Sequence, residues 1–335
     1  MEKSYNPTVL DLFCGAGGFS EGFEQAGFNI LAGIDSVPYA LGTFYSNHDA
    51  DAYNLDLRAL SPEEVLAELG IAPNDVDVVI GGPPCQGHSE QGKQDPDDAR
   101  NKLMNDYLDI LKHVQPRAFV MENVPGIQKT DDGVFLSGVL DRVKKMGYTI
   151  DSGVLDADQF GVPQTRSRYF LVGSRSGDPS LPVPPAADPT PVYEVLNRVQ
   201  MRDDLPNNDW REQKSAHHKS TVDDYYATPL GVDPYENSDQ QVRLPLERPA
   251  RTIVADNFHF HPHQPRYLTI REAAALQTFP NDYRFLGGVV SQREQVGNAV
   301  PPMLANHIAQ VVRESLENQA DRQVTMSETN VAQAD

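Results

Sequence analysis

The sequence has few of the features that mark exported, membrane-bound or disulfide-stabilised proteins. It holds two cysteines in 335 residues, too few for a disulfide framework or a thiolate metal site. No stretch approaches the roughly 18 apolar residues of a membrane span. The first residues also lack the basic and then apolar segments of a signal peptide. We therefore expect a cytoplasmic protein with no membrane contact and no metal.

Positive charge is scarce as well. The chain has 28 lysines and arginines against 48 acidic residues, a net charge of −20, and only nine of the cations are lysine. The acidic residues run along the whole chain instead of forming one patch. This distribution is typical of a surface adapted to a high-salt cytoplasm, as in halophilic archaea, and does not indicate a cationic partner. The net charge therefore does not exclude DNA as a substrate.

The first 175 residues alternate short apolar runs with helical patterns, which predicts an α/β domain with a largely parallel sheet. We expect strands at 9–13, 30–35, 77–80, 118–122 and 169–172, and helices at 19–25, 39–45 and 103–114.

Composition changes after this domain. Residues 176–191 are rich in proline and predict a linker, and 193–247 are polar and irregular. Helices are expected again at 269–276, where Thr269 and Glu272 have capping-box spacing, and at 299–316. We expect three parts: a domain of 1–175 completed by 294–317, a lobe of 176–290, and a disordered tail of 318–335.

A glycine-rich turn follows the first expected strand, with Gly15, Gly17 and Gly18 in the pattern G-x-G-G. Such a turn lets a ligand approach the backbone at a helix N-terminus. The third glycine of a dinucleotide site is missing, which favours a nucleoside ligand without a diphosphate; an ordinary glycine turn is the alternative. Asp35 ends the next expected strand, 30–35, where a carboxylate often binds ribose hydroxyls. Asp56 is a further acidic residue at a strand end, and either one could instead be a surface aspartate.

Cys85 follows two glycines and two prolines at the end of the strand 77–80. The prolines stiffen the segment and present the thiol above the sheet, so Cys85 is either a nucleophile or a buried apolar residue. Glu122 ends a neighbouring strand and could protonate a heterocycle, or be a helix cap or a solvated carboxylate. Arg166 and Arg168 alternate along an extended segment and project on one face.

These segments together resemble the DNA (cytosine-5) methyltransferase family, in its prokaryotic form. The resemblance is carried by DLFCGAGGF at 11–19, GGPPCQ at 81–86, ENV at 122–124, QTRSR at 164–168 and GNAVPP at 297–302, which occur in the family's order. It spans residues 8–312, apart from the middle of 176–247.

The resemblance implies a Rossmann-like, S-adenosylmethionine-dependent mixed sheet with a smaller, irregular target-recognition lobe. The implied reaction transfers a methyl group to C5 of a cytosine flipped out of double-stranded DNA, through a covalent bond between Cys85 and C6. Glu122 would hold N3 and the exocyclic amine, and Arg168 and Arg166 the O2 side. Cofactor contacts would come from Phe13, Gly15, Ala16, Gly18, Asp35, Asp56, Leu103 and Asn298, and DNA contacts from Gln86 and Ser89.

The resemblance also implies a monomer, acting alone or beside a separate restriction endonuclease. The chain departs from the family pattern at His88, where phenylalanine is usual, and at Ser36, where an aromatic residue often stacks on adenine. The candidates for base contacts are Trp210, Arg211, Lys214, His217 and Lys219. Two alternatives stay open: a tRNA cytosine-5 methyltransferase and a catalytically silent DNA-binding module.

Overall fold

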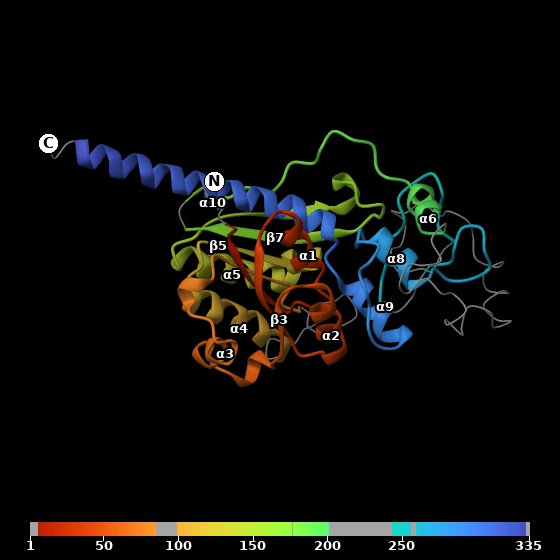
Figure 1. The fold of residues 1–335 in the computed structure, drawn as a ribbon, viewed down its shortest axis with the longest axis horizontal. Coiled ribbons are helices and arrows are strands. Elements are labelled where there is room, and N and C mark those ends of the chain that lie inside the picture. Colours follow the sequence, from red (N-terminus) through yellow and green to blue (C-terminus); the bar gives the residue numbers. More distant parts are fainter. Residues whose placement is uncertain (1–5, 85–98, 176, 201–242, 256–258, 333–335) are drawn as a thin grey trace.

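The computed structural model describes residues 6–84, 99–175, 177–200, 243–255 and 259–332. Its centre is a seven-stranded sheet in the order β3-β2-β1-β4-β5-β7-β6 (Figure 1). The strands are β1 Thr8–Leu12, β2 Asn29–Asp35, β3 Asp51–Asn54, β4 Val78–Gly81, β5 Ala118–Asn123, β6 Thr149–Asp156 and β7 Ser167–Ser174. The first five run parallel, and β7 is antiparallel to both β5 and β6. The predicted mixed sheet is confirmed.

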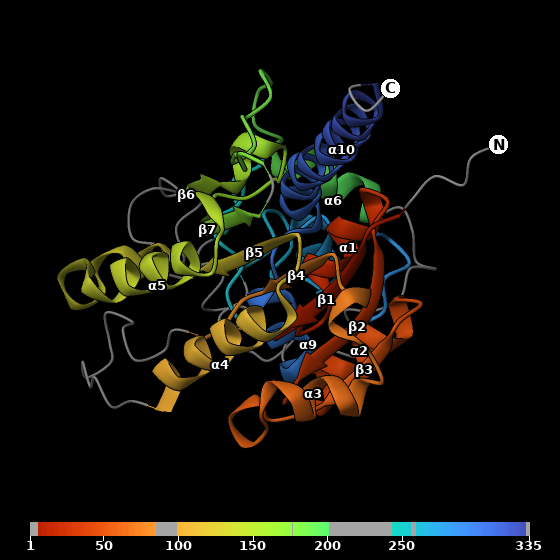
Figure 2. The same cartoon turned by 90° about the vertical axis from the view of Figure 1, so that its left-hand side faces the viewer.

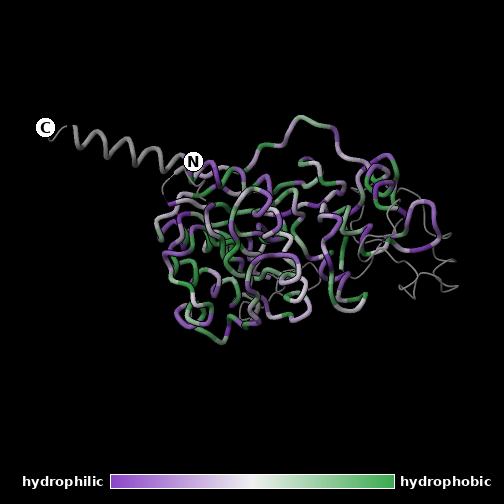
Figure 3. The backbone as a smooth tube through the Cα atoms, in the orientation of Figure 1, coloured by the Kyte–Doolittle hydropathy of each residue, from purple (hydrophilic) through white to green (hydrophobic). Residues whose placement is uncertain are grey.

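Helices cover both faces of this sheet, because its strands alternate apolar side chains between two cores. The helices are α1 Gly18–Gln25, α2 Pro38–Asn47, α3 Pro62–Leu69, α4 Ala99–Val114, α5 Val134–Lys145, α6 Val192–Gln200, α8 Ile270–Leu276, α9 Val289–Asn298 and α10 Pro302–Ala332. One core joins the sheet to α1 and α10, and the other joins it to α3, α4 and α5. Figure 2 shows these two groups of helices on opposite sides of the sheet. In Figure 3 hydrophobic segments concentrate in this interior.

A third apolar core lies outside the sheet. It joins α6, α8 and α9, and it includes Ala16 from the loop after β1. The helix α8 begins at a Thr269 cap with a complete capping box to Glu272, as the sequence predicts. The helix α6 was not expected, although Val192, Leu196 and Val199 are buried at helical spacing. This lobe therefore packs directly on the loop that follows the first strand.

The C-terminal segment returns to the first domain. The helix α10 packs along α1, and its apolar face reaches Leu316 in the first core. Its backbone continues as a helix to Ala332, where the polar composition predicts disorder from residue 318. Residues 318–332 contain neither proline nor glycine, so nothing in the sequence ends the helix there. None of the helices within the described ranges is long and apolar enough to cross a membrane.

Candidate active site

A cavity of about 620 Å³ opens at the carboxyl ends of β1, β2, β4 and β5. The chain order reverses there, between β1 and β4, and open α/β sheets bind ligands at such a point. All eight residues predicted to contact a cofactor line this cavity: Phe13, Gly15, Ala16, Gly18, Asp35, Asp56, Leu103 and Asn298. Glu122 and Arg168 line it as well. The structure thus brings together residues from both ends of the chain.

The loop between β1 and α1 is held in an uncommon backbone conformation. Phe13 and Gly15 both have positive φ, at 64° and 53°, a region that residues other than glycine seldom occupy. The Gly15 amide donates to Asp35 Oδ2 over 2.9 Å. A Cβ built on Gly15 would meet no atom within 4 Å, so the backbone here borders open space. A ligand can therefore lie directly against the peptide groups of this loop.

Two carboxylates flank the loop in different environments. Asp35 accepts backbone hydrogen bonds from Gly15 and Val37, and burial raises its pKa despite them. Asp56 lies at the more exposed rim, where the Arg58 guanidinium binds both its oxygens and lowers its pKa. Each carboxyl group is held in place and retains lone pairs for a donor. Asp35 and Asp56 can therefore accept hydrogen bonds from two separate donor groups of one ligand.

Glu122 and Arg168 form an ion pair in the deeper part of the cavity. Because β5 and β7 are antiparallel neighbours, the two side chains meet, with Arg168 Nε 2.9 Å from Glu122 Oε1. Burial raises the pKa of Glu122, and the two nearby guanidiniums, Arg168 and Arg166, only partly oppose that rise. A carboxyl group with a raised pKa can carry a proton to a ring nitrogen near neutral pH.

The segment that leads to Cys85 passes close to this pair. A Cβ on Gly82 would lie 2.9 Å from Glu122 Oε2, so a larger residue at position 82 would displace the carboxyl group. Asn123 Nδ2 donates to the Pro83 carbonyl over 3.0 Å, which fixes the segment one step further on. Cys85, Gln86 and Ser89, like the candidates for base contacts in 201–242, lie outside the described residues.

Arg166 does not line the cavity. Its side chain is 1% exposed and points to the other lobe, where it donates to the carbonyls of Ile253 and Gly297 over 3.1 and 2.9 Å. The alternation along the extended segment predicts only that Arg166 and Arg168 project on one face. It cannot predict the partners of Arg166, because the two acceptors lie about 90 and 130 residues away in the sequence. In the structure Arg166 joins the lobes, whereas Arg168 lines the cavity.

The cavity also contains residues that the sequence did not single out, among them Tyr39, Glu294 and Gln295. Tyr39 donates from its hydroxyl to Glu294 and links α2 to α9 beside the cavity. Tyr39 lies three residues after Ser36, the position at which the family often has an aromatic residue. Tyr39 therefore supplies to this cavity an aromatic ring that position 36 lacks. Gln295 is one helical turn before Asn298 on α9, and that spacing is the signal by which it could have been found.

Known proteins resemble this chain in both sequence and fold. The model of the C-5 cytosine-specific DNA methylase family matches residues 7–314. The Type II methyltransferase M1.HphI of Haemophilus parahaemolyticus is 35% identical over 322 residues, which cover 91% of this chain and 86% of that one. M.AgeI of Thalassovita gelatinovora, also a Type II methyltransferase, is 29% identical over 423 residues, covering 91% and 99%.

Solved structures of methyltransferases resemble this chain in fold. A DNA modification methyltransferase encoded within an E. coli prophage matches with a TM-score of 0.77 at 26% identity, covering 93% of this chain and 100% of that one. The Dnmt2 methyltransferase of S. pombe matches with a TM-score of 0.68 at 18% identity, covering 93% and 99%, and shares the fold.

Proposed function

We propose that this chain, which belongs to the C-5 cytosine-specific DNA methylase family, methylates cytosine through a covalent bond from Cys85 to a base flipped into the cavity. That it is a DNA cytosine-5 methyltransferase follows from the family. The roles of individual residues are our proposal. The observation that carries it is the convergence of the glycine loop, Glu122 and Arg168 on one cavity, beside the segment that bears the thiol.

The cavity fits S-adenosylmethionine, the methyl donor of this family. Its volume of about 620 Å³ suits a ligand of that size. The open backbone at Gly15 suits close approach of the nucleoside, and Asp35 and Asp56 suit a ribose and an adenine amine. When bound, this molecule supplies a methyl group activated by a sulfonium. The remaining cofactor contacts are expected from Phe13, Ala16, Gly18, Leu103 and Asn298, and we propose that no metal takes part.

The ion pair provides a binding site for the cytosine ring. Arg168 would donate to O2, while Glu122 would accept from the exocyclic amine and share its proton with N3. Proton transfer toward N3 draws electrons from the ring, and C6 becomes electrophilic. The Cys85 thiolate then adds its electron pair to C6, and the ring electrons move to C5. C5 would bond to the methyl group as the bond from that methyl to the sulfonium breaks, and the sulfur would keep the electron pair as a neutral thioether.

The last steps restore the aromatic ring. A base removes the proton from C5, the electron pair reforms the C5–C6 double bond, and the thiolate of Cys85 leaves. The target carbon lies inside the stack of a duplex, so the base must first rotate out, at a cost of a few kcal/mol. We propose that Gln86 and Ser89 act on the DNA side of this step and that the lobe 176–290 reads the target sequence.

The chain's relatives are Type II methyltransferases, which supports a place in a restriction-modification system. We propose that the chain acts as a monomer in the cytoplasm, where its DNA lies, and that any cognate endonuclease is a separate protein.

Duplex DNA containing 5-fluorocytosine tests the covalent mechanism, because fluorine cannot leave C5 as a proton does and the adduct persists. We expect a DNA adduct on the wild-type chain and none on Cys85→Ser. Cys14→Ala is the matched control and should still form the adduct. In the wild-type chain burial raises the pKa of the Cys14 thiol, so that thiol stays protonated and should not react. An adduct on Cys85→Ser, or methyl transfer by it near the wild-type rate, would refute the mechanism.

A further inference from the structure

A short hairpin of two extended segments occupies residues 259–268 of the lobe. Phe260 pairs antiparallel with Tyr267, and their rings stack with the centroids 4.6 Å apart. A backbone hydrogen bond on each side of this pair extends the contact between the two segments. The tip of the hairpin is therefore the sequence Pro-His-Gln-Pro at 262–265.

A buried histidine fixes the backbone of this tip. His261 Nδ1 accepts hydrogen bonds from the amides of His263 and Gln264, both over 3.1 Å. Burial lowers the pKa of His261 to about 4, so the ring is neutral near pH 7 and its Nδ1 can accept. Pro262 and Pro265 stiffen the same turn. The side chains of His263 and Gln264 are exposed, whereas the backbone that carries them is held in place.

An ion pair anchors the base of the hairpin to α8. The Arg266 guanidinium donates to both carboxylate oxygens of Glu272, each over 2.8 Å, and both side chains are buried. Glu272 also accepts from the Thr269 amide in the cap of α8. Arg266 contacts the tip as well, because its Nε donates to Gln264 Oε1 over 2.7 Å. The tip is thus tied to the first turn of a helix in the third core.

The hairpin begins beside the wall of the cavity. His259 Nε2 lies 3.1 Å from the carbonyl oxygen of Thr252. The Thr252 hydroxyl in turn donates over 2.6 Å to the carbonyl of Thr165, which lies three residues before the cavity residue Arg168. The start of the hairpin is thus two contacts away from the segment that supplies Arg168.

The tip lies within a short distance of this wall. His263 is four residues after His259, so even a fully extended chain would carry it at most about 14 Å. Successive base pairs of a duplex are about 3.4 Å apart along its axis. A duplex whose cytosine is rotated into the cavity therefore has several base pairs within the distance that this hairpin spans.

The lobe around the hairpin has the opposite charge balance to the chain as a whole. Residues 243–255 and 259–300 contain seven arginines and four acidic residues, although the whole chain has a net charge of −20. An excess of positive charge attracts the phosphate backbone of DNA and brings its base edges near the neighbouring side chains.

We propose that His263 and Gln264 contact base edges beside the flipped cytosine, and that His261 is the positioning residue that holds them there. The tip has no arginine or lysine, and its two amides already donate to His261, which leaves neither a fixed charge nor a backbone donor for a phosphate. Arg266 occupies the oxygen of the Gln264 amide, whose nitrogen remains as a donor. A donor on a rigid backbone suits an acceptor on a base edge. The inference rests on the proposed role of the lobe 176–290 in reading the target sequence.

A duplex library with randomised base pairs on both sides of one cytosine tests this proposal. Wild type and each variant methylate the library at saturating S-adenosylmethionine, and bisulfite sequencing gives the ratio of rates between the bases at every position. We expect Gln264→Ala and His263→Ala each to lose about tenfold in discrimination at one or two positions, the effect of one base contact. Ratios at the other positions, the affinity for S-adenosylmethionine and Tm should stay unchanged. Gln310→Ala, which removes an exposed glutamine from α10, is the matched control and should keep every ratio.

The role of His261 needs a readout that a loss of stability alone does not change. His261→Ala removes the acceptor for both amides, so we expect the same loss of base discrimination as in Gln264→Ala, although Gln264 is present. An asparagine can accept through its side-chain oxygen from the backbone two residues further on. His261→Asn should therefore restore the wild-type ratios.

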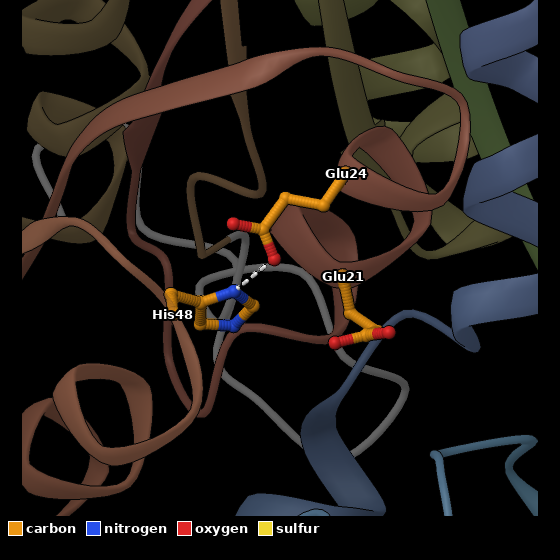
Figure 4. Close-up of side chains that lie close together, drawn as sticks. All are labelled: Glu21, Glu24 and His48. Carbon is orange, nitrogen blue, oxygen red and sulfur yellow. Dashed lines mark hydrogen bonds and ion pairs between the residues drawn. The ribbon is translucent and has the colours of Figure 1, made fainter.

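His48→Ala is the control for the loss of a buried histidine elsewhere. Its side chain has no exposed surface, and its Nδ1 lies 2.6 Å from Glu24 Oε2. Figure 4 shows the ring beside Glu24 and Glu21 of α1, in the first domain. We expect this variant to lose stability, as His261→Ala does, and to keep every base ratio.

Unchanged ratios in Gln264→Ala or His263→Ala would overturn the contact proposed for that residue. A loss of rate that is equal for all sequences would also overturn it, since the tip would then contact phosphates. Relaxed ratios in His48→Ala would refute the positioning role of His261. A wild-type chain that methylates no cytosine in the library would instead refute the proposed function.

Discussion

Replacing Arg166 by lysine separates its structural role in this fold from the substrate contact that the sequence suggested. The guanidinium reaches two buried carbonyls in different directions, those of Ile253 and Gly297. One lysine ammonium can satisfy only one of them, and an unpaired buried carbonyl costs about 1–3 kcal/mol. At about 2–4 °C per kcal/mol for a chain of this size, Arg166→Lys should lower Tm by roughly 2–12 °C.

Arg168→Lys is the matched comparison. Arg168 faces the cavity and pairs with Glu122, so we expect a Tm within about 2 °C of wild type and a loss of about a hundredfold in kcat. Scanning fluorimetry and methyl transfer from labelled cofactor give the two quantities for each variant. If Arg166→Lys kept the wild-type Tm while losing activity and 5-fluorocytosine trapping, Arg166 would contact substrate and our assignment would be refuted.

Three further changes test the carboxyl groups and the segment before Cys85. Glu122→Gln keeps hydrogen bonding but cannot give a proton to N3, so kcat should fall by about 10²–10⁴ while calorimetry shows unchanged cofactor affinity; undiminished turnover would exclude Glu122 as the acid. Burial raises the pKa of Asp11 to about 8, above its unfolded value of about 3.9. Only the folded state therefore keeps that proton between these values, and stability falls as pH rises toward 8, by at most about 1.4 kcal/mol per pH unit. Urea unfolding at pH 6 and pH 8 should show a smaller fall in Asp11→Asn, and an equal fall would contradict the assignment. Asn123→Ala frees the Pro83 carbonyl, so 5-fluorocytosine trapping should slow while cofactor affinity is kept; unchanged trapping would mean that Asn123 does not position the thiol.

The sequence predicted those parts of the site that depend on local order along the chain. A parallel sheet brings the carboxyl ends of its strands to one edge, so the glycine loop, Asp35 and Glu122 could be placed together once the strands were assigned. The edge strand β6 was missed because most of its residues are only half-buried, which leaves no clear alternation. The direction of Arg166 was missed because its partners lie in the other lobe.

The contacts that no local pattern could reveal are those by which the C-terminal half holds the loop between β1 and α1. A Cβ on Gly18 would lie 2.4 Å from the Val300 carbonyl, and Ala16 packs into the core of the lobe. Asp35 holds the same loop from β2. The loop is thus fixed from three directions by segments that come from both ends of the chain. A fragment ending before α8 would retain the G-x-G-G sequence but lose both the Val300 contact and most of the core that covers Ala16. The geometry of this loop therefore depends on the assembled lobes.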